Sequence, residues 1–307
     1  MVQLYMRGFC QKLVMLFIFS LALTGCASNK SLELVNNYAQ KSKEVEEALL
    51  QVYEQTHEAR VDALMVQASR DGIASNDLNV QRINNSGQME LLQNLLSFSQ
   101  SIYLLSSESF DKELNENSRQ LNSSIISMSE RLPSEALDNS QIEITVTAIN
   151  ALVRARSERA RYQHLKAIFI GSNEIIQRSF QTLSSELVSW QRITTISMEK
   201  ELRTRLYLLN NPNRCETIET AQCATITHTL EERVDAYRQA YILKSKITSL
   251  GDEFESLRGA LAAVQNLNSK LVESLKRDDD LTKSNFVNAL ESAQDQIKKL
   301  QDFQSNL

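Results

Sequence analysis

A run of apolar side chains with heptad spacing near the C-terminus most strongly constrains how this chain can fold. Ten positions follow one another at alternating four- and three-residue steps, and nine of them are apolar: Leu243, Ile247, Leu250, Phe254, Leu257, Leu261, Val264, Asn268, Leu271 and Leu275. This spacing places all ten side chains along one face of a helix, as in coiled coils and helical bundles. A capping box formed by Thr229 and Glu232 marks the expected start of this helix. We therefore predict a long helix that packs against at least one other helix.

The same steps recur elsewhere in the chain and predict further long helices. The first covers residues 31–69, with a seam formed by Tyr38, Ser42, Val45, Leu49, Val52, Thr56, Ala59, Ala63 and Val66. The charged residues between these positions are expected to face water: Glu44, Glu46, Glu47, Glu54, Glu58 and Arg60. A second helix is predicted from about residue 77 to Pro133 with a break at 85–87, and a third from about 141 to 209 with a bend at 171–173. A last helix is expected after the acidic run 278–280.

The scarcity of turn-forming residues argues against a sheet fold. The chain has seven glycines and two prolines, Pro133 and Pro212. Residues 142–148 alternate in polarity as a strand does, but no second segment could pair with them, so a helix is favoured there too. Long helices joined by short turns must fold back on one another. The predicted fold class is all-α, an elongated antiparallel helical bundle or coiled-coil hairpin. Pairing between separate chains is the alternative reading of the seams.

The N-terminal segment has the layout of a secretory signal. Arg7 and Lys12 precede an apolar run from Leu13 to Leu23, and small residues follow. The run ends in Leu23-Thr24-Gly25-Cys26, which resembles the lipobox of bacterial lipoprotein signal peptides. Eleven apolar residues would cross about half of a ~30 Å hydrocarbon core, so a membrane-spanning anchor is the weaker alternative. An ordinary secretory signal with an incidental cysteine is the other alternative.

The resemblance to lipoprotein signals implies a cellular location and a membrane anchor. Residues 1–25 would be removed, and Cys26 would be the lipid attachment site, carrying three acyl chains such as palmitate. Two or more chains hold a protein stably on a membrane, and residues 26–30 would be a short tether. In Gram-negative lipoproteins an Asp after the cysteine commonly retains the protein in the inner membrane. Ala27 stands there, so the resemblance favours the outer membrane, with the body facing the periplasm, over the inner membrane or the cell surface.

Charge and length limit the partners of the remaining chain. The whole sequence has 33 basic and 38 acidic residues, a net charge of −5, and loss of Arg7 and Lys12 with the signal would leave −7. Such a chain has no overall electrostatic attraction to nucleic acid. Residues 31–307 are predicted to form a single elongated helical domain, and no nucleic-acid partner is expected.

Two cysteines remain after the N-terminal segment, Cys215 and Cys223. They lie in a stretch rich in asparagine that includes Pro212, which predicts a loop at about residues 210–228. In an oxidising periplasm two cysteines this close would join, so we predict a disulfide. Closing so short a loop contributes about 2 to 3 kcal/mol in the chain-entropy description. A metal site would need two more ligands, and His228 is the single candidate nearby.

Two further motifs were weighed as candidate sites. Glu54 and His57 have the Glu-x-x-His spacing of di-iron bundles, but such a site needs the motif twice and it occurs once, so no metal or other cofactor is predicted. A basic cluster is expected on one helix, formed by Arg154, Arg156, Arg159 and Arg161. It would pair with acids such as Glu158, or it would form a contact patch for an anionic envelope polymer or an acidic protein.

The sequence offers no catalytic constellation. The three histidines, His57, His164 and His228, are far apart, and neither a nucleophile-elbow motif nor a glycine-rich phosphate loop occurs. We therefore expect a protein that is not an enzyme: a lipid-anchored helical scaffold or adaptor that binds an envelope protein or itself. The alternative is a helical module that binds a lipid or a small apolar molecule, with Phe180 and Trp190 in its interior.

Overall fold

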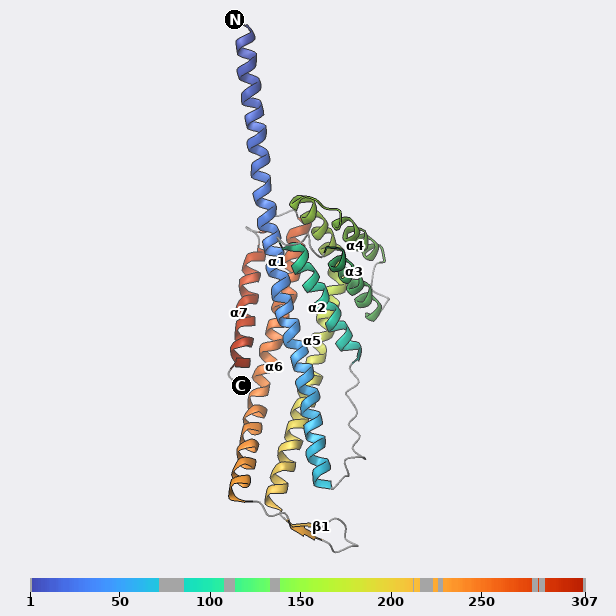
Figure 1. Cartoon of the computed structure of the whole chain (residues 1–307), viewed down its shortest axis with the longest axis vertical. Helices are drawn as coiled ribbons and strands as arrows, with labels where there is room; N and C mark the ends of the chain where they lie inside the picture. Colours follow the sequence, from blue (N-terminus) through green and yellow to red (C-terminus); the bar gives the residue numbers. More distant parts are fainter. Residues whose placement is uncertain are drawn as a thin grey trace.

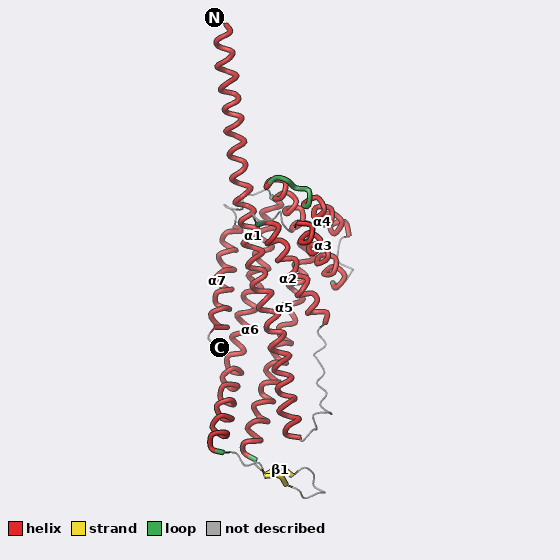
Figure 2. The backbone as a smooth tube through the Cα atoms, in the orientation of Figure 1, coloured by secondary structure: helices red, strands yellow, loops and turns green. Residues whose placement is uncertain are grey.

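The computed structural model describes residues 2–71, 86–107, 114–132, 139–211, 213–215, 223–225, 229–277, 281 and 285–305. Side chains of the first helix are described from Lys30 onward, and those of the two strands are not described. The helices are α1 (Val2–Asp71), α2 (Ser86–Ser106), α3 (Leu114–Arg131), α4 (Asn139–Leu152), α5 (Glu158–Asn210), α6 (Leu230–Lys276) and α7 (Asn285–Ser305). The strands are β1 (Asn213–Cys215) and β2 (Cys223–Thr225). The predicted all-α bundle is confirmed (Figure 2).

Three long helices form the axis of the molecule. α1 and α5 run in one direction and α6 returns alongside them, so α6 is antiparallel to both; the N-terminal part of α1 projects alone beyond the other helices (Figure 1). The shorter helices gather around the half of this trio nearer the N-terminus, where α2 packs on α1, α4 on α5 and α7 on α6. Of the described residues, the other half contains α1, α5 and α6, and the β1–β2 hairpin lies at its end. The described fold is therefore thick at one end and a three-helix rod at the other.

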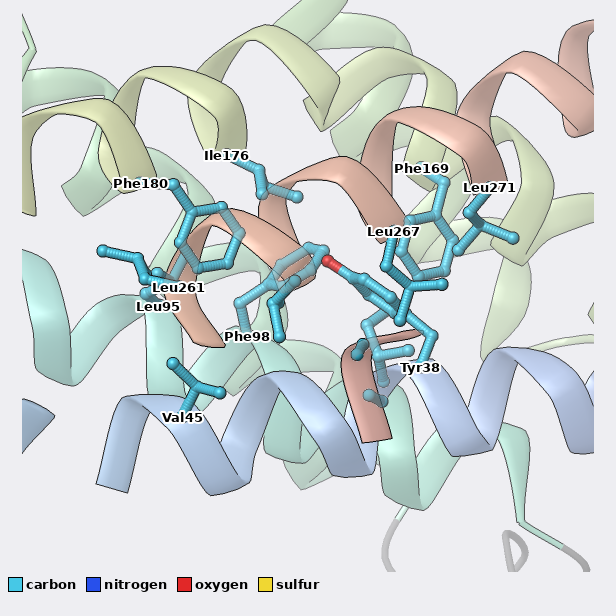
Figure 3. Packing of buried hydrophobic residues seen from close by; sticks show 14 of the residues in the cluster. Tyr38, Val45, Leu95, Phe98, Phe169, Ile176, Phe180, Leu261, Leu267 and Leu271 are labelled. Atoms are coloured by element: carbon cyan, nitrogen blue, oxygen red, sulfur yellow. The ribbon is translucent and has the colours of Figure 1, made fainter. Parts of the chain in front are cut away.

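The hydrophobic core lies where four helices meet. Tyr38 of α1, Phe98 of α2 and Phe169 of α5 form a buried aromatic group, with Phe169 edge-on to both other rings at centroid distances of 5.3 and 6.1 Å. Leucines of α6 close the group from the remaining side (Figure 3). Edge-to-face pairs of this kind add about 0.5 to 1.5 kcal/mol each to the burial of the rings. Helices far apart in sequence are thus joined by their largest side chains.

The heptad seam of α6 packs within the chain. Its positions from Leu250 to Leu275 are all buried against α1, α5 and α7, whereas Leu243 and Ile247 are only partly covered. The polar member, Asn268, accepts a hydrogen bond from the Tyr38 hydroxyl at 3.0 Å and donates one to Asn173 Oδ1 at 3.2 Å. These two bonds tie α6 to α1 and α5 in one register. The predicted capping box is confirmed, with Glu232 accepting from the Thr229 amide at 2.8 Å.

Two of the predicted helix boundaries were wrong. The helix expected to run unbroken to Pro133 ends at Ser106, and the chain resumes as α3, which folds back against α2. The helix expected over 141–209 is broken at 153–157, where the Ser157 side chain accepts a hydrogen bond from the Ala160 amide and caps α5. Apolar positions resume within a few residues of each break because each new helix also needs an apolar face.

The glycine that suggested a bend lies inside the continuous helix α5. A Cβ atom on Gly171 would collide with Thr145 Oγ1 of α4, so the missing side chain lets the two helices approach closely. α4 itself contains residues 142–148, and the helix favoured there over a strand is confirmed. Gly171 therefore serves packing between helices.

Candidate functional site

An open groove lies between α1, α5 and α6 in the three-helix half of the molecule. Its volume is about 510 Å³. It is lined on α1 by Gln51, Val52, Gln55, Thr56, Glu58, Ala59 and Asp62, on α5 by Thr194, Met198, Glu201 and Arg205, and on α6 by Gln239, Ile242, Leu243, Lys246, Ser249, Leu250, Glu253 and Phe254. A volume of this size is typical of ligand sites.

The groove lies next to the surface of α1 and α6 on which α7 packs. A Cβ atom on Gly259 of α6 would lie 3.2 Å from Gln296 Oε1 of α7, which fixes how these two helices are aligned. Because antiparallel helices advance at the same rise, Ser305 at the end of α7 lies level with about Leu250. Beyond that level α6 has one buried residue, Ala240, between Leu230 and Ser249. The groove is thus the part of the α1–α6 surface that α7 does not cover.

The floor of the groove joins polar and apolar groups. The hydroxyls of Thr56 on α1 and Thr194 on α5 are 2.7 Å apart and fully buried. One hydroxyl donates to the other, which donates in turn to the carbonyl one turn back on its own helix; these carbonyls are Val52 O, 2.8 Å from Thr56 Oγ1, and Trp190 O, 2.9 Å from Thr194 Oγ1. The Trp190 ring lies edge-on to Tyr53 with centroids 4.1 Å apart. α1 and α5 are therefore held together beneath the groove by both a hydroxyl pair and an aromatic pair.

Two buried carboxylates lie in the groove and differ in their partners. Glu201, 6% exposed, accepts a hydrogen bond from Arg205 Nε at 2.7 Å, and Arg205 also donates to Gln239 at 3.2 Å. Glu253, also 6% exposed, has no hydrogen bond or ion pair with the described side chains. Burial raises the pKa of Glu253, and the positive charge of Lys246 lowers it by a smaller amount. Glu253 is thus a buried acid that lacks a close donor.

A third buried carboxylate lies in the core, outside the groove. Glu46 was expected to face water, and this was wrong: it is fully buried between α1 and α2. Glu46 Oε1 accepts hydrogen bonds from the Ser42 and Ser99 hydroxyls at 2.8 and 2.9 Å, while Oε2 has none. Burial raises the pKa of Glu46 to about 8 against the smaller opposing effect of the two serines. Ser42 of α1 and Ser99 of α2 supply the hydrogen bonds for this buried carboxylate. No pattern in the sequence indicates that these three residues meet.

The predicted arginine cluster does not lie on one helix. Arg154 and Arg156 are exposed in the turn between α4 and α5, and Arg159 is exposed in the first turn of α5. Arg161 is buried and donates to the Ser107 carbonyl at 3.0 Å, which ties α5 to the end of α2. Arg161 therefore has a structural contact, and the other three leave a smaller basic surface at the turn.

The structure places no further metal ligands beside the Glu-x-x-His motif among the described residues. Glu54 is exposed and His57 is partly covered on α1. Within the part of the chain that the structure describes, no three histidine, cysteine or acidic side chains gather as a metal site would require. In the same residues no helix is long and apolar enough to cross a membrane.

The cysteine segment forms a small hairpin where a loop was expected. β1 and β2 are antiparallel, and Cys215 is directly opposite Cys223 in their register. Directly opposed residues in an antiparallel pair have Cα atoms about 4.5 to 5.5 Å apart, within the range of about 4.4 to 6.8 Å that disulfides span. The backbone is therefore compatible with the predicted disulfide, whose side chains lie outside the described residues, as does the side chain of Cys26.

We expect mass mapping without reductant to find Cys215 and Cys223 blocked and joined to each other. Because the hairpin lies at one end of the rod, substitution of both cysteines by serine should leave the helical circular dichroism almost unchanged. Closing the loop should contribute about 2 to 3 kcal/mol at most. Two free thiols in protein taken from an oxidising compartment would contradict the disulfide.

Sequence reasoning placed the helices of the groove but missed the groove itself. Neither Glu201 nor Glu253 was singled out, because a buried acid on a helix looks like any surface acid in a sequence. The sequence gives no signal of the opening: Leu243 and Ile247 continue the heptad spacing of α6, and the structure leaves both only partly covered.

Comparison with protein families, curated proteins and solved structures found no match to this chain.

Proposed function

We propose that this protein is a lipid-anchored, non-catalytic helical adaptor of the bacterial cell envelope that binds a protein partner in the periplasm. Support comes from the lipobox resemblance at Cys26 and from the shape of the described body. α6 alone has 47 residues and is roughly 70 Å long at about 1.5 Å per residue. The N-terminus of α1 and the β1–β2 hairpin lie at opposite ends of the long axis (Figure 1). A body of this form would present its three-helix half away from the membrane.

The observation that carries this proposal is an apolar stripe on the uncovered part of α6. It consists of Leu230, Val234, Tyr237 and Tyr241, which follow one another at four-, three- and four-residue steps. These side chains are 43 to 74% exposed, and the Tyr237 hydroxyl donates to Asn210 Oδ1 at the end of α5 at 3.2 Å. Heptad-spaced apolar residues form one half of a coiled-coil contact. We call these four residues the outer stripe and propose that a helix of the partner packs on it.

The alternative function, binding of an apolar molecule, receives less support. The groove has six acidic or cationic side chains on its walls besides its glutamines, whereas sites for apolar ligands are lined mainly by apolar groups. Phe180 and Trp190, the residues considered for such a site, are both buried in the packed core.

The proposed partner contact can be tested by cross-linking in intact cells. A photoreactive amino acid at Tyr241 should give a discrete protein adduct, and the same amino acid at Asn266, exposed on the covered part of α6, should not. Val234→Asp should abolish the adduct because it places a charge within the outer stripe. Differently tagged copies of the chain will show whether the adduct is self-association. Equal labelling from both positions, or none from either, would refute the proposed contact.

The anchor has its own test. Cys26→Ala should abolish incorporation of a labelled fatty acid, because no other group at that position can accept the diacylglyceryl chain. The Ala27→Asp variant should keep the label and shift the protein toward the inner membrane in fractionation. Fatty-acid label retained by Cys26→Ala would exclude the lipoprotein assignment.

A further inference from the structure

We propose that the groove between α1, α5 and α6 is a binding site for an organic cation, an alkylammonium or guanidinium group, and that Glu253 is its principal acceptor. The cation would be carried either by a free polyamine or by a lysine or arginine side chain of a protein. The site is separate from the outer stripe, because none of the four stripe residues lines the groove. It therefore does not depend on the proposed adaptor contact.

The first support is the state of Glu253. A carboxylate with little access to water and without a hydrogen-bond donor or a counter-ion is poorly stabilised. The Glu253 side chain is only 6% exposed and reaches solvent through the groove, yet none of the described side chains donates to it, and Lys246 acts on it only from beyond ion-pair distance. Its carboxylate lines the groove, so a group that enters the groove can reach it. A cationic donor supplies both the missing hydrogen bond and the missing charge.

The second support is the contrast with Glu201 in the same groove. Glu201 is equally buried, and its charge is met by Arg205 of the next helical turn. The chain therefore shows how a guanidinium group is accommodated in this groove. Position 253 offers the same acceptor without the intramolecular partner. The cation would take the role at Glu253 that Arg205 takes at Glu201.

The third support is the chemistry of the walls. Four residues at four-, three- and four-residue steps give the α1 wall a row of side-chain oxygens: Gln51, Gln55, Glu58 and Asp62. Across the groove the lining contains four carboxylates and two cations, and one of those cations, Arg205, is already paired. The site is thus negative overall and rich in acceptors. An anion would meet Glu58, Asp62 and Glu253, and an apolar group would leave them without water.

The length of the groove fits an extended cation. Its lining on α1 spans residues 51–62, which at about 1.5 Å per residue is roughly 16 Å along the helix axis. The apolar face of α7 fills the same surface nearer the N-terminus with Phe286, Leu290, Ile297 and Leu300. Where α7 ends, carboxylates join the apolar side chains of this surface. An occupant with positive charge suits that lining.

The experiment uses the full chain in detergent at low ionic strength, with two probes. The first is spermidine, and the second is a helical alanine peptide with lysine at every fourth position. Binding is measured by calorimetry and by the fluorescence of Trp190, the one tryptophan, which is one turn from Thr194 at the groove floor. We expect at least one probe to bind, and added salt to weaken it. Spermidine binding assigns the site to free polyamines, and peptide binding alone assigns it to a protein's basic side chain.

Matched variants decide whether Glu253 is the acceptor. Glu253→Gln should weaken binding by about tenfold or more, as expected for loss of a charge-assisted hydrogen bond. Glu255→Gln, an exposed site two residues along the same helix, should leave the affinity unchanged. Thermal unfolding followed by circular dichroism checks that both variants are folded. Failure of both probes to bind, or equal weakening by both substitutions, would overturn the site without affecting the cross-linking test of the outer stripe.

Discussion

Replacing Glu46 with glutamine should make the protein more stable than the wild type above pH 8. In the folded state burial raises the pKa of Glu46 to about 8, compared with an ordinary value of 4.5. A carboxyl whose pKa is raised by folding favours the folded state below pH 4.5, and that contribution is lost as the pH rises through 8. At about 1.4 kcal/mol for each pKa unit, the loss is on the order of 3 to 5 kcal/mol by pH 9. Glutamine remains neutral, keeps an acceptor for Ser42 and Ser99, and avoids this loss.

The measurement is urea unfolding of both proteins at pH 5, 7 and 9. The two should have nearly the same free energy of unfolding at pH 5 and diverge toward pH 9, with the variant more stable. Glu47→Gln is the matched control, because Glu47 is the neighbouring residue on α1 and is exposed. Its difference from the wild type should be small and should not grow between pH 5 and 9. A constant offset between Glu46→Gln and the wild type at all three pH values would show that Glu46 is not buried as described.

Leu257→Ala should destabilise the folded protein by about 2 to 5 kcal/mol. Leu257 is fully buried at the centre of the α6 seam, so the substitution removes apolar burial and leaves a cavity. Because the seam packs against α1, α5 and α7 of the same chain, the loss should appear in the stability of the monomer and not depend on protein concentration. Chemical unfolding at two protein concentrations measures it.

Leu230→Ala is the control for this substitution on the same helix. Leu230 is 74% exposed, so its truncation should change the free energy of unfolding by less than about 0.5 kcal/mol. It belongs to the outer stripe, and it should instead weaken the adduct formed from position 241. A concentration-dependent loss of stability in Leu257→Ala would mean that the seam packs between chains.

The sequence alone determined the fold class and most of the helices. Heptad spacing over α1, α5 and α6 predicted long helices because an apolar face must be buried, whatever its partner. Thr229 marked the start of α6 because a capping box is a local arrangement of adjacent residues. The same local logic explains the errors: apolar positions resume within a few residues of Ser107 and of residues 153–157, so the pattern does not reveal that the chain reverses or breaks there.

Only the tertiary structure decided which polar residues are buried and where the surface stays open. Glu46 and Glu47 are adjacent acids on one helix, yet α2 covers the first and not the second, since burial depends on the neighbouring helix. Arg161 differs from Arg159 for the same reason, because the end of α2 reaches it. The groove exists because α7 ends level with about Leu250 while α1, α5 and α6 continue. A local pattern fixes the face of a helix, but the length over which another helix covers that face is a property of the assembled fold.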